Sequence, residues 1–307
     1  MAKRMAPQTS HQPKLGLALG GGAALGWAHI GALRALGDLG VRPDIVAGTS
    51  MGAIVGAAWL CGALDELDEL ARSMSWRRLV AFADPKLGAP GLFRGDAIIQ
   101  ELVRRLGPRR IEDLDRPFVA VAADLVSGTE VHISEGPLDF AVRASMSVPG
   151  VFLPIERGSQ LLVDGGLVNP VPVAAAKRLG AEFVIAIDVM GDYSGRAKAA
   201  GLGLPPPGAD RQAAASGDWL RTFAGRLFAG SPKRPGIYSI GAVSVALIMR
   251  KLAEANQSLC PADIRVVPAI GHISPIEFDR AAELIQAGYD AMRRHASELR
   301  DFARTDP

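Results

Sequence analysis

Cysteine is scarce in this chain, and its two copies, Cys61 and Cys260, lie far apart with no cluster of metal ligands beside either. This spacing argues against a disulfide framework and against a zinc site, and it favours two free thiols. An excess of one charge sign is also missing, because 34 lysines and arginines nearly balance 32 aspartates and glutamates. Nucleic-acid-binding proteins usually carry a basic stripe, so we expect no nucleic-acid partner.

Long apolar runs are absent as well. No such run reaches the roughly 20 residues that a membrane-spanning helix needs. The longest candidate, residues 237–249, is short and interrupted by serine and glycine. The polar N-terminus, residues 1–13, lacks the apolar centre of a signal peptide, and we interpret it as a disordered tail. These features predict a soluble, cytoplasmic protein, and they leave peripheral contact with a membrane open.

Hydrophobic residues are plentiful, at 49% of 307 positions, which is enough for a large core. Through residues 14–191, short β-like runs alternate with stretches of helical periodicity. This alternation predicts an α/β fold with three α/β/α layers and a mostly parallel central sheet covered on both faces. Residues 192–236 are rich in glycine and proline and are interpreted as an insertion or flap. Residues 237–307 are expected to complete the same domain.

The individual elements follow from apolar spacing, capping residues and turn residues. Strands are expected at residues 14–20, 44–49, 161–163, 183–189 and 263–268, with a hairpin formed by 118–123 and 129–133. Helices are expected at residues 24–39, 51–61, 65–74, 96–106, 139–145, 173–179, 243–257 and 275–301.

One strand-to-helix junction carries a reactive side chain. Ser50 follows an apolar run and precedes a helical segment, and Gly48 and Gly52 flank it two residues away on either side. A tight turn here pushes one side chain outward, and the glycines remove Cβ atoms that would clash. The neighbouring helix N-terminus favours a developing anion. The segment predicts a nucleophile elbow; the alternative is a glycine-rich turn that only packs a helix closely on the sheet.

A glycine-rich segment, residues 20–26, follows the first expected strand. The consecutive Gly20, Gly21 and Gly22 let main-chain N–H groups turn toward one point, which suits a pyrophosphate or an oxyanion. The glycine spacing does not fit the dinucleotide fingerprint, and no Gly-Lys-Ser/Thr follows as a phosphate loop requires. An oxyanion hole is therefore favoured over nucleotide binding.

A serine nucleophile needs a neighbour that accepts its proton. His272 lies in a late loop, where the α/β-hydrolase order of Ser, Asp and His would place a base. Asp164 is the other candidate, since it ends a strand and Gly165 and Gly166 leave space around its carboxylate. An ordinary Asp-Gly turn would also explain that sequence. Partial desolvation would raise the pKa of Asp164 and make it a better base. His29 fits a packed or partly exposed helix position.

Four segments stand in one order along the chain: residues 20–26, residues 48–52, residues 144–154, and Asp164-Gly165-Gly166. Together they resemble the patatin-like phospholipases, in particular the compact bacterial members. The resemblance is close from residue 14 to about residue 179 and holds only in outline beyond it. It implies a patatin-like fold and hydrolysis of carboxylic esters of lipids, with residues 144–154 as a packed wall near the site.

The resemblance also implies a serine–aspartate dyad without histidine, in which Ser50 is the nucleophile and Asp164 is the base. Main-chain N–H groups would form the oxyanion hole, at Gly20, Gly21, Gly22 and Met51. Residues that would line a pocket are Ser147, Pro149, Phe152, Gly165 and Gly166. A serine–aspartate pair needs no metal and no organic cofactor, so none is expected.

The chain departs from the family pattern at Leu25, where many relatives carry a basic residue. The missing charge would weaken the stabilisation of an oxyanion or phosphate, or favour a neutral acyl ester over a phospholipid. The activity implied by the resemblance therefore leaves the kind of lipid open.

Residues 218–228 have a composition that suits a helix at a membrane interface, because Trp219, Phe223 and Leu227 recur every four residues. A lid over the dyad and an ordinary packed helix are the alternatives. Two other functions also stay open. One is a transacylase that uses the same serine with a histidine such as His272, and the other is a low-activity regulatory protein that binds lipid.

Overall fold

The computed structural model describes residues 13–74, 101, 107, 109–193 and 237–303, and side chains in the last range from Ser244 onward. Most of the predicted tail, of the helix predicted at 96–106 and of the predicted insertion at 192–236 lies outside the described residues. The predicted interfacial segment with Trp219, Phe223 and Leu227 lies outside them as well.

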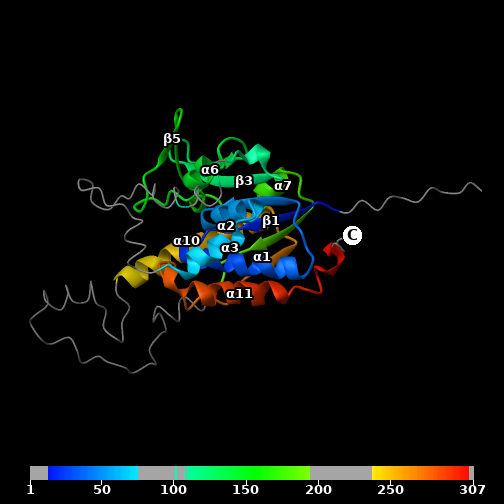
Figure 1. Ribbon diagram of the computed structural model, residues 1–307. Coiled ribbons are helices and arrows are strands. Elements are labelled where there is room, and N and C mark those ends of the chain that lie inside the picture. Colours follow the sequence, from blue (N-terminus) through cyan, green and yellow to red (C-terminus); the bar gives the residue numbers. More distant parts are fainter. Residues whose placement is uncertain (1–12, 75–100, 102–106, 108, 194–236, 304–307) are drawn as a thin grey trace, which may run out of the picture.

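A mostly parallel sheet of eight strands forms the centre of the described structure (Figure 1). The strands are β1 Leu15–Leu19, β2 Ile45–Thr49, β3 Phe118–Asp124, β4 Thr129–Ile133, β5 Ile155–Arg157, β6 Gln160–Asp164, β7 Phe183–Ile187 and β8 Ile264–Val266. Hydrogen-bonded neighbours follow the order β5-β6-β3-β2-β1-β7-β8, and β4 pairs with β3. The run β3-β2-β1-β7-β8 is parallel, while β4, β5 and β6 pair antiparallel.

The parallel strands are short apolar runs that are buried at nearly every position, as a sheet covered on both faces requires. In β1, Leu17 and Leu19 pack in the core on one face and Ala18 packs in the core on the other. The small side chain of Ala18 fits a face where alanine and valine predominate, so helices approach the sheet closely there.

Helices cover both faces of the sheet. They are α1 Ala28–Asp38, α2 Met51–Leu60, α3 Leu64–Arg72, α6 Leu138–Ser145, α7 Val173–Arg178, α10 Ile237–Leu259 and α11 Ala281–Arg293. Side chains of α1, α2, α3, α6 and α11 pack in the larger core, whereas α7 and Ala253 of α10 pack in the core of the opposite face. The predicted three-layer α/β/α fold is therefore confirmed. No helix in the described part of the chain has both the length and the apolar character needed to cross a membrane.

Helices α1 and α11 lie side by side with their backbones in contact (Figure 1). A Cβ atom at Gly31 would lie 1.7 Å from the carbonyl oxygen of Ile285, and one at Gly288 would lie 1.8 Å from that of Ala28. Neither position has room for a side chain. The C-terminal helix is thus fixed to the helix that follows the glycine-rich segment.

The predicted helix over residues 275–301 is too long. Its first part is a 3-10 turn, Phe278–Arg280, and α11 ends at Arg293. Two contacts explain the late start: the Ser274 N–H donates to the Glu277 carboxylate, and the Pro275 carbonyl accepts from Ala24 N at 2.9 Å. This part of the chain is thereby tied to the glycine-rich segment. Strand β5, which has three residues, was not predicted.

Candidate active site

Ser50 lies at a strained turn between β2 and α2. Its φ of 55° and ψ of −121° are unusual for a residue with a side chain, and such backbone strain costs on the order of 1–3 kcal/mol. A Cβ atom at Gly48 would lie 2.5 Å from Ala53 Cα, and one at Gly52 would lie 2.1 Å from Leu19 O. Both flanking glycines are therefore required by close approach of the backbone. This is the geometry of a nucleophile elbow.

Strand β3 brings Ser50 and Asp164 together. The pairing of β2 with β3 ends with Thr49 opposite Val121, and β6 pairs with β3 from Asp164, which lies opposite Ala122. Strand β4 occupies the other edge of β3. Strands β2 and β6 therefore approach each other end to end along the same edge of β3. The Ser50 hydroxyl lies close enough to the Asp164 carboxylate at this junction to lower its pKa.

Asp164 is buried beside Ser50. Burial raises the pKa of its carboxyl group to about 6, although hydrogen bonds from Ser50 and from Gly166 N act in the opposite direction. The Gly166 N–H donates to Asp164 Oδ1 at 2.7 Å. A Cβ atom at Gly165 would lie 2.2 Å from Val121 O, so this glycine is needed for close packing on β3. A carboxylate with a pKa near 6 is ionised at neutral pH and is basic enough to accept a proton.

Two of the predicted oxyanion donors are already engaged. The Gly20 N–H donates to Ile187 O at 3.0 Å, and the Gly21 N–H donates to Pro170 O at 2.9 Å. Both residues are buried, because the end of β1 continues its pairing with β7 at this point. Gly20 and Gly21 thus hold the segment in place, and the prediction that their amides bind an oxyanion is corrected on this ground.

The amides available as donors are those of Gly22, Ala23 and Met51, which have no hydrogen-bond partner among the described residues. Gly22 and Ala23 are partly exposed, and Met51 N lies in the first turn of α2, where amides lack intrahelical partners. A Cβ atom at Gly21 would lie 3.3 Å from Ser50 Cβ, which places this segment against the elbow. Ala23 was not predicted as a donor, because only the consecutive glycines of this segment were considered.

Ala23 shares the unusual backbone of Ser50. Its φ is 49°, and these two are the only residues other than glycine with a positive φ in the described part of the chain. A left-handed residue after Gly22 redirects the following amide, Ala24 N–H, which donates to Pro275 O at 2.9 Å. The strain at Ala23 therefore accompanies the turn that separates the free N–H groups of Gly22 and Ala23 from the engaged N–H of Ala24.

His29 is fully buried and contacts the glycine-rich segment at Gly20. Its Nε2 lies 2.7 Å from Gly20 O, and burial lowers the pKa of its imidazole to about 4. Since a carbonyl oxygen can only accept, Nε2 of the neutral ring donates this hydrogen bond. His29 is thus a packed helix residue that holds the Gly20 peptide.

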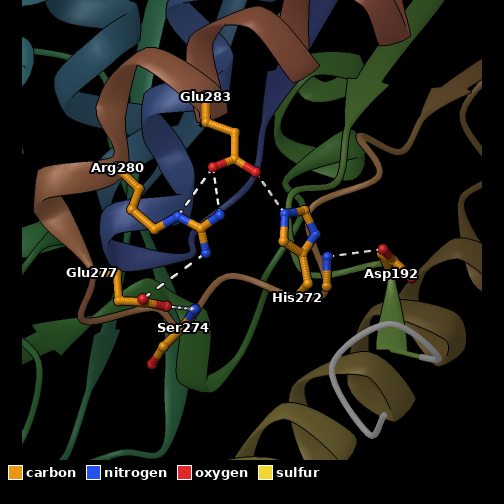
Figure 2. A network of polar contacts seen from close by, with 7 residues as sticks. Asp192, His272, Ser274, Glu277, Arg280 and Glu283 are labelled. Carbon is orange, nitrogen blue, oxygen red and sulfur yellow. Dashed lines mark hydrogen bonds and ion pairs between the residues drawn. The ribbon is translucent and has the colours of Figure 1, made fainter. Parts of the chain in front are cut away.

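His272 belongs to a separate network on the surface (Figure 2). Its Nε2 lies 2.6 Å from Glu283 Oε1, and the other oxygen of Glu283 accepts from Arg280. The His272 side chain is 52% exposed, whereas Ser50 is buried and its hydroxyl already has Asp164 as a partner. The geometry therefore supports Asp164 over His272 as the partner of Ser50.

Residues 144–154 pack beside the dyad. The Ser147 hydroxyl is fully buried and lies between Arg143 Nη1 at 2.6 Å and Arg143 O at 2.7 Å, so it faces Arg143 and lines no open pocket. Pro149 lies in an exposed turn, and Phe152 packs under the Arg143 guanidinium. Among the predicted pocket residues, only Gly165 and Gly166 lie directly beside the Asp164 carboxylate.

Leu25, at the position where the sequence departs from the family pattern, is fully buried in the larger core. Its side chain contributes packing there. Within the described ranges, no group of three or more histidine, cysteine, aspartate or glutamate residues could hold a metal ion.

Comparisons with known proteins bear on this site. Residues 17–177 match the family described as patatin-like phospholipase. An uncharacterized NTE family protein of Mycobacterium tuberculosis is 41% identical over 189 residues, covering 62% of this chain and 52% of that protein. The chain thus spans about half the length of this relative. Patatin-like phospholipase domain-containing protein 6 of Mus musculus is 37% identical over 183 residues, or 57% of this chain and 13% of that protein.

The fold is shared with a solved structure. The crystal structure of VipD from Legionella pneumophila has a TM-score of 0.52 to this chain, covering 92% of this chain and 66% of VipD at 13% sequence identity. A likeness at this identity concerns the fold alone. The family match, by contrast, covers more than half of the chain and includes both Ser50 and Asp164. The chain belongs to the patatin-like phospholipase family.

Proposed function

We propose that this protein is a serine hydrolase that cleaves carboxylic ester bonds of lipids through an acyl-enzyme. The observation that carries this proposal is the juxtaposition of Ser50, at a strained strand-to-helix turn, and Asp164, a buried carboxylate with a raised pKa that the Ser50 hydroxyl lowers. A strained turn orients a hydroxyl as a nucleophile, and a raised pKa makes a carboxylate an effective base. The membership of the chain in the patatin-like phospholipase family supports a lipid as the substrate.

In the first half of the proposed reaction, Asp164 accepts the hydroxyl proton while Ser50 Oγ bonds to the ester carbonyl carbon. The carbonyl oxygen becomes an oxyanion, which the amides of Gly22, Ala23 and Met51 would stabilise. Loss of one such donor typically lowers turnover by about 100- to 1000-fold. The carbon–oxygen bond to the alcohol then breaks, and Asp164 passes its proton to the departing alkoxide.

In the second half, water attacks the acyl-enzyme. Asp164 accepts a proton from that water, the bond between Ser50 Oγ and the acyl carbon breaks, and the proton returns to Ser50. The products are a fatty acid and an alcohol. The reaction needs no redox partner and no metal, since each proton taken by Asp164 is returned within the cycle.

Covalent labelling tests the proposal directly. A fluorophosphonate probe should label the wild-type protein at Ser50, as located by mass spectrometry of the labelled peptide, and should leave Ser50→Ala unlabelled. Wild-type protein should also hydrolyse a medium-chain acyl ester, and Ser50→Ala should lose at least about 1000-fold of that activity. Labelling at another residue, or equal hydrolysis by Ser50→Ala, would refute the proposal.

The lipid class is the second part of the test. The buried Leu25 leaves no cation at that position of the glycine-rich segment, so we propose neutral acyl esters as better substrates than phospholipids. Peripheral contact with a membrane remains a prediction. Assaying one ester in neutral micelles and in anionic vesicles measures it, because membrane contact would raise the rate in vesicles.

A further inference from the structure

Residues 145–147, at the end of α6, contact the backbones of both Ser50 and Asp164. We propose that Ser145 is a positioning residue, whose hydroxyl holds the strained backbone of Ser50 in the orientation that the reaction needs. This inference rests on the proposed function, because it assumes that Ser50 is the nucleophile.

The hydrogen-bond directions at Ser145 are fixed by its partners. Ser145 Oγ lies 2.6 Å from Val121 O, which can only accept, so the hydroxyl proton points to Val121. The Ser50 N–H donates to Ser145 Oγ at 2.8 Å. Ser145 is fully buried, and it therefore connects β3 to the elbow through one hydroxyl that water does not reach.

The same segment holds the other member of the dyad. Asp164 N donates to Ser147 O at 2.9 Å, at the point where β6 ends. Ser50 directly follows β2 and Asp164 is the last residue of β6, so the two residues belong to different strands. The turn at residues 145–147 spans the junction between β2 and β6 and fixes the distance between the two backbones.

Removing the hydroxyl would release Ser50. Its amide is buried, so in Ser145→Ala it would lack a partner, and rotation of the Ser50 peptide would relieve both this loss and the positive φ. Such a rotation moves Ser50 Oγ relative to Asp164 and moves the adjoining Met51 amide. A displacement of about 1 Å at a reacting group can lower a rate about 100-fold.

The test compares the rate and the end point of fluorophosphonate labelling. Ser145→Ala should label about 10- to 100-fold more slowly than wild type but should reach the same final stoichiometry. In a plot of the labelling rate against pH, the acidic midpoint of Ser145→Ala should also move to higher pH. The reason is that the Ser50 hydroxyl, which lowers the pKa of Asp164, would act on it less. A residue that only stabilises the fold would reduce the stoichiometry and leave the pH midpoint in place.

Thr49→Val is the matched control. The Thr49 hydroxyl is equally buried and adjacent in sequence to Ser50, but it donates to Asn169 O at 2.9 Å and does not touch the Ser50 amide. This substitution also removes a buried hydroxyl that donates to a backbone carbonyl. The labelling rate of Thr49→Val should stay within about threefold of wild type.

Several outcomes decide the inference. If wild type does not label, the proposed function fails. If wild type labels and Ser145→Ala labels equally fast, or only to a reduced stoichiometry, the role of Ser145 is refuted. If Ser145→Ala shows no cooperative thermal unfolding, Ser145→Cys replaces it, because a thiol is a weaker acceptor. Slower labelling of Ser145→Cys to full stoichiometry supports the inference, and a wild-type rate or reduced stoichiometry overturns it.

Discussion

Two polar clusters in this molecule contain groups capable of acid–base chemistry, and they differ in exposure. Asp164 is buried, and desolvation raises the pKa of its carboxyl group to about 6. Glu283, in the surface network of Figure 2, is exposed, and hydrogen bonds from His272 and Arg280 lower the pKa of its carboxyl group. The presence of a histidine or a carboxylate therefore says little about function. The environment decides which carboxylate becomes a base at neutral pH.

The strongest test of this comparison removes the buried charge. Asp164→Asn should lower ester hydrolysis by about 1000-fold, because the general base is lost. It should also stabilise the protein at pH 8. The pKa of Asp164 is raised from 3.8 to about 6 in the folded protein, so the folded state loses stability as pH rises between these values.

Above pH 6 the wild-type penalty amounts to about 3 kcal/mol, from roughly two pKa units at 1.36 kcal/mol each. The neutral asparagine side chain in Asp164→Asn carries no such penalty. The hydrogen bonds that this side chain makes determine how much of the 3 kcal/mol appears in the free energy of unfolding. Urea unfolding of both proteins at pH 8 and pH 4 measures the effect. The gap should be largest at pH 8 and should close near pH 4; a gap independent of pH would contradict the burial argument.

A second test uses wild-type protein alone. Because Asp164 must be ionised to accept a proton, kcat/KM should fall about tenfold per pH unit below a midpoint near pH 6. If Glu283 were the base, its lowered pKa would place the midpoint below the ordinary value of a glutamate. The profile should also be measured in His272→Ala, where the midpoint should not change.

A third test concerns backbone strain at the site. Ala23→Gly places a residue without a Cβ atom at a φ of 49°, which should stabilise the protein by about 1 kcal/mol. Gly37→Ala offers a comparison, because a Cβ atom there meets nothing within 4 Å and helix propensity alone should act. Thermal unfolding of the two variants compares them, and a loss of stability in Ala23→Gly would show that the positive φ carries no strain.

The smallest effect is expected at the surface cluster. His272→Ala should change ester hydrolysis by less than about twofold, because the exposed His272–Glu283 pair contributes little and lies outside the dyad. Steady-state rates at pH 8 are sufficient to check this. A loss of 100-fold or more would reverse the comparison and restore the histidine as a candidate base.

Local features of the site could be predicted from the sequence, and long-range ones could not. The elbow at Ser50 followed from a strand, a helix and two glycines that lie within a few residues of one another. The contact between Ser50 and Asp164 arises because β2 and β6 pair with successive parts of one edge of β3. No short segment of the sequence predicts that pairing. The family resemblance supplied the pairing instead.

The glycine-rich segment shows the same limit. Three consecutive glycines indicated a cradle of amides, but the sequence could not show that β7 and the loop after Asp164 already use two of them. Similarly, His29 gave no signal beyond helical spacing, although its imidazole holds the Gly20 peptide. Which donors remain free is decided by partners far away in the chain.

The contact between α1 and α11 has a practical consequence for anyone who trims this chain. The family match ends at residue 177, whereas α11, whose backbone contacts Gly31, begins at Ala281. A fragment cut at residue 177 would lack α11 and expose the apolar side chains of α1 that pack with it, which promotes aggregation. The region matched by the family therefore ends before the folded unit does, and expression experiments should include the chain through α11.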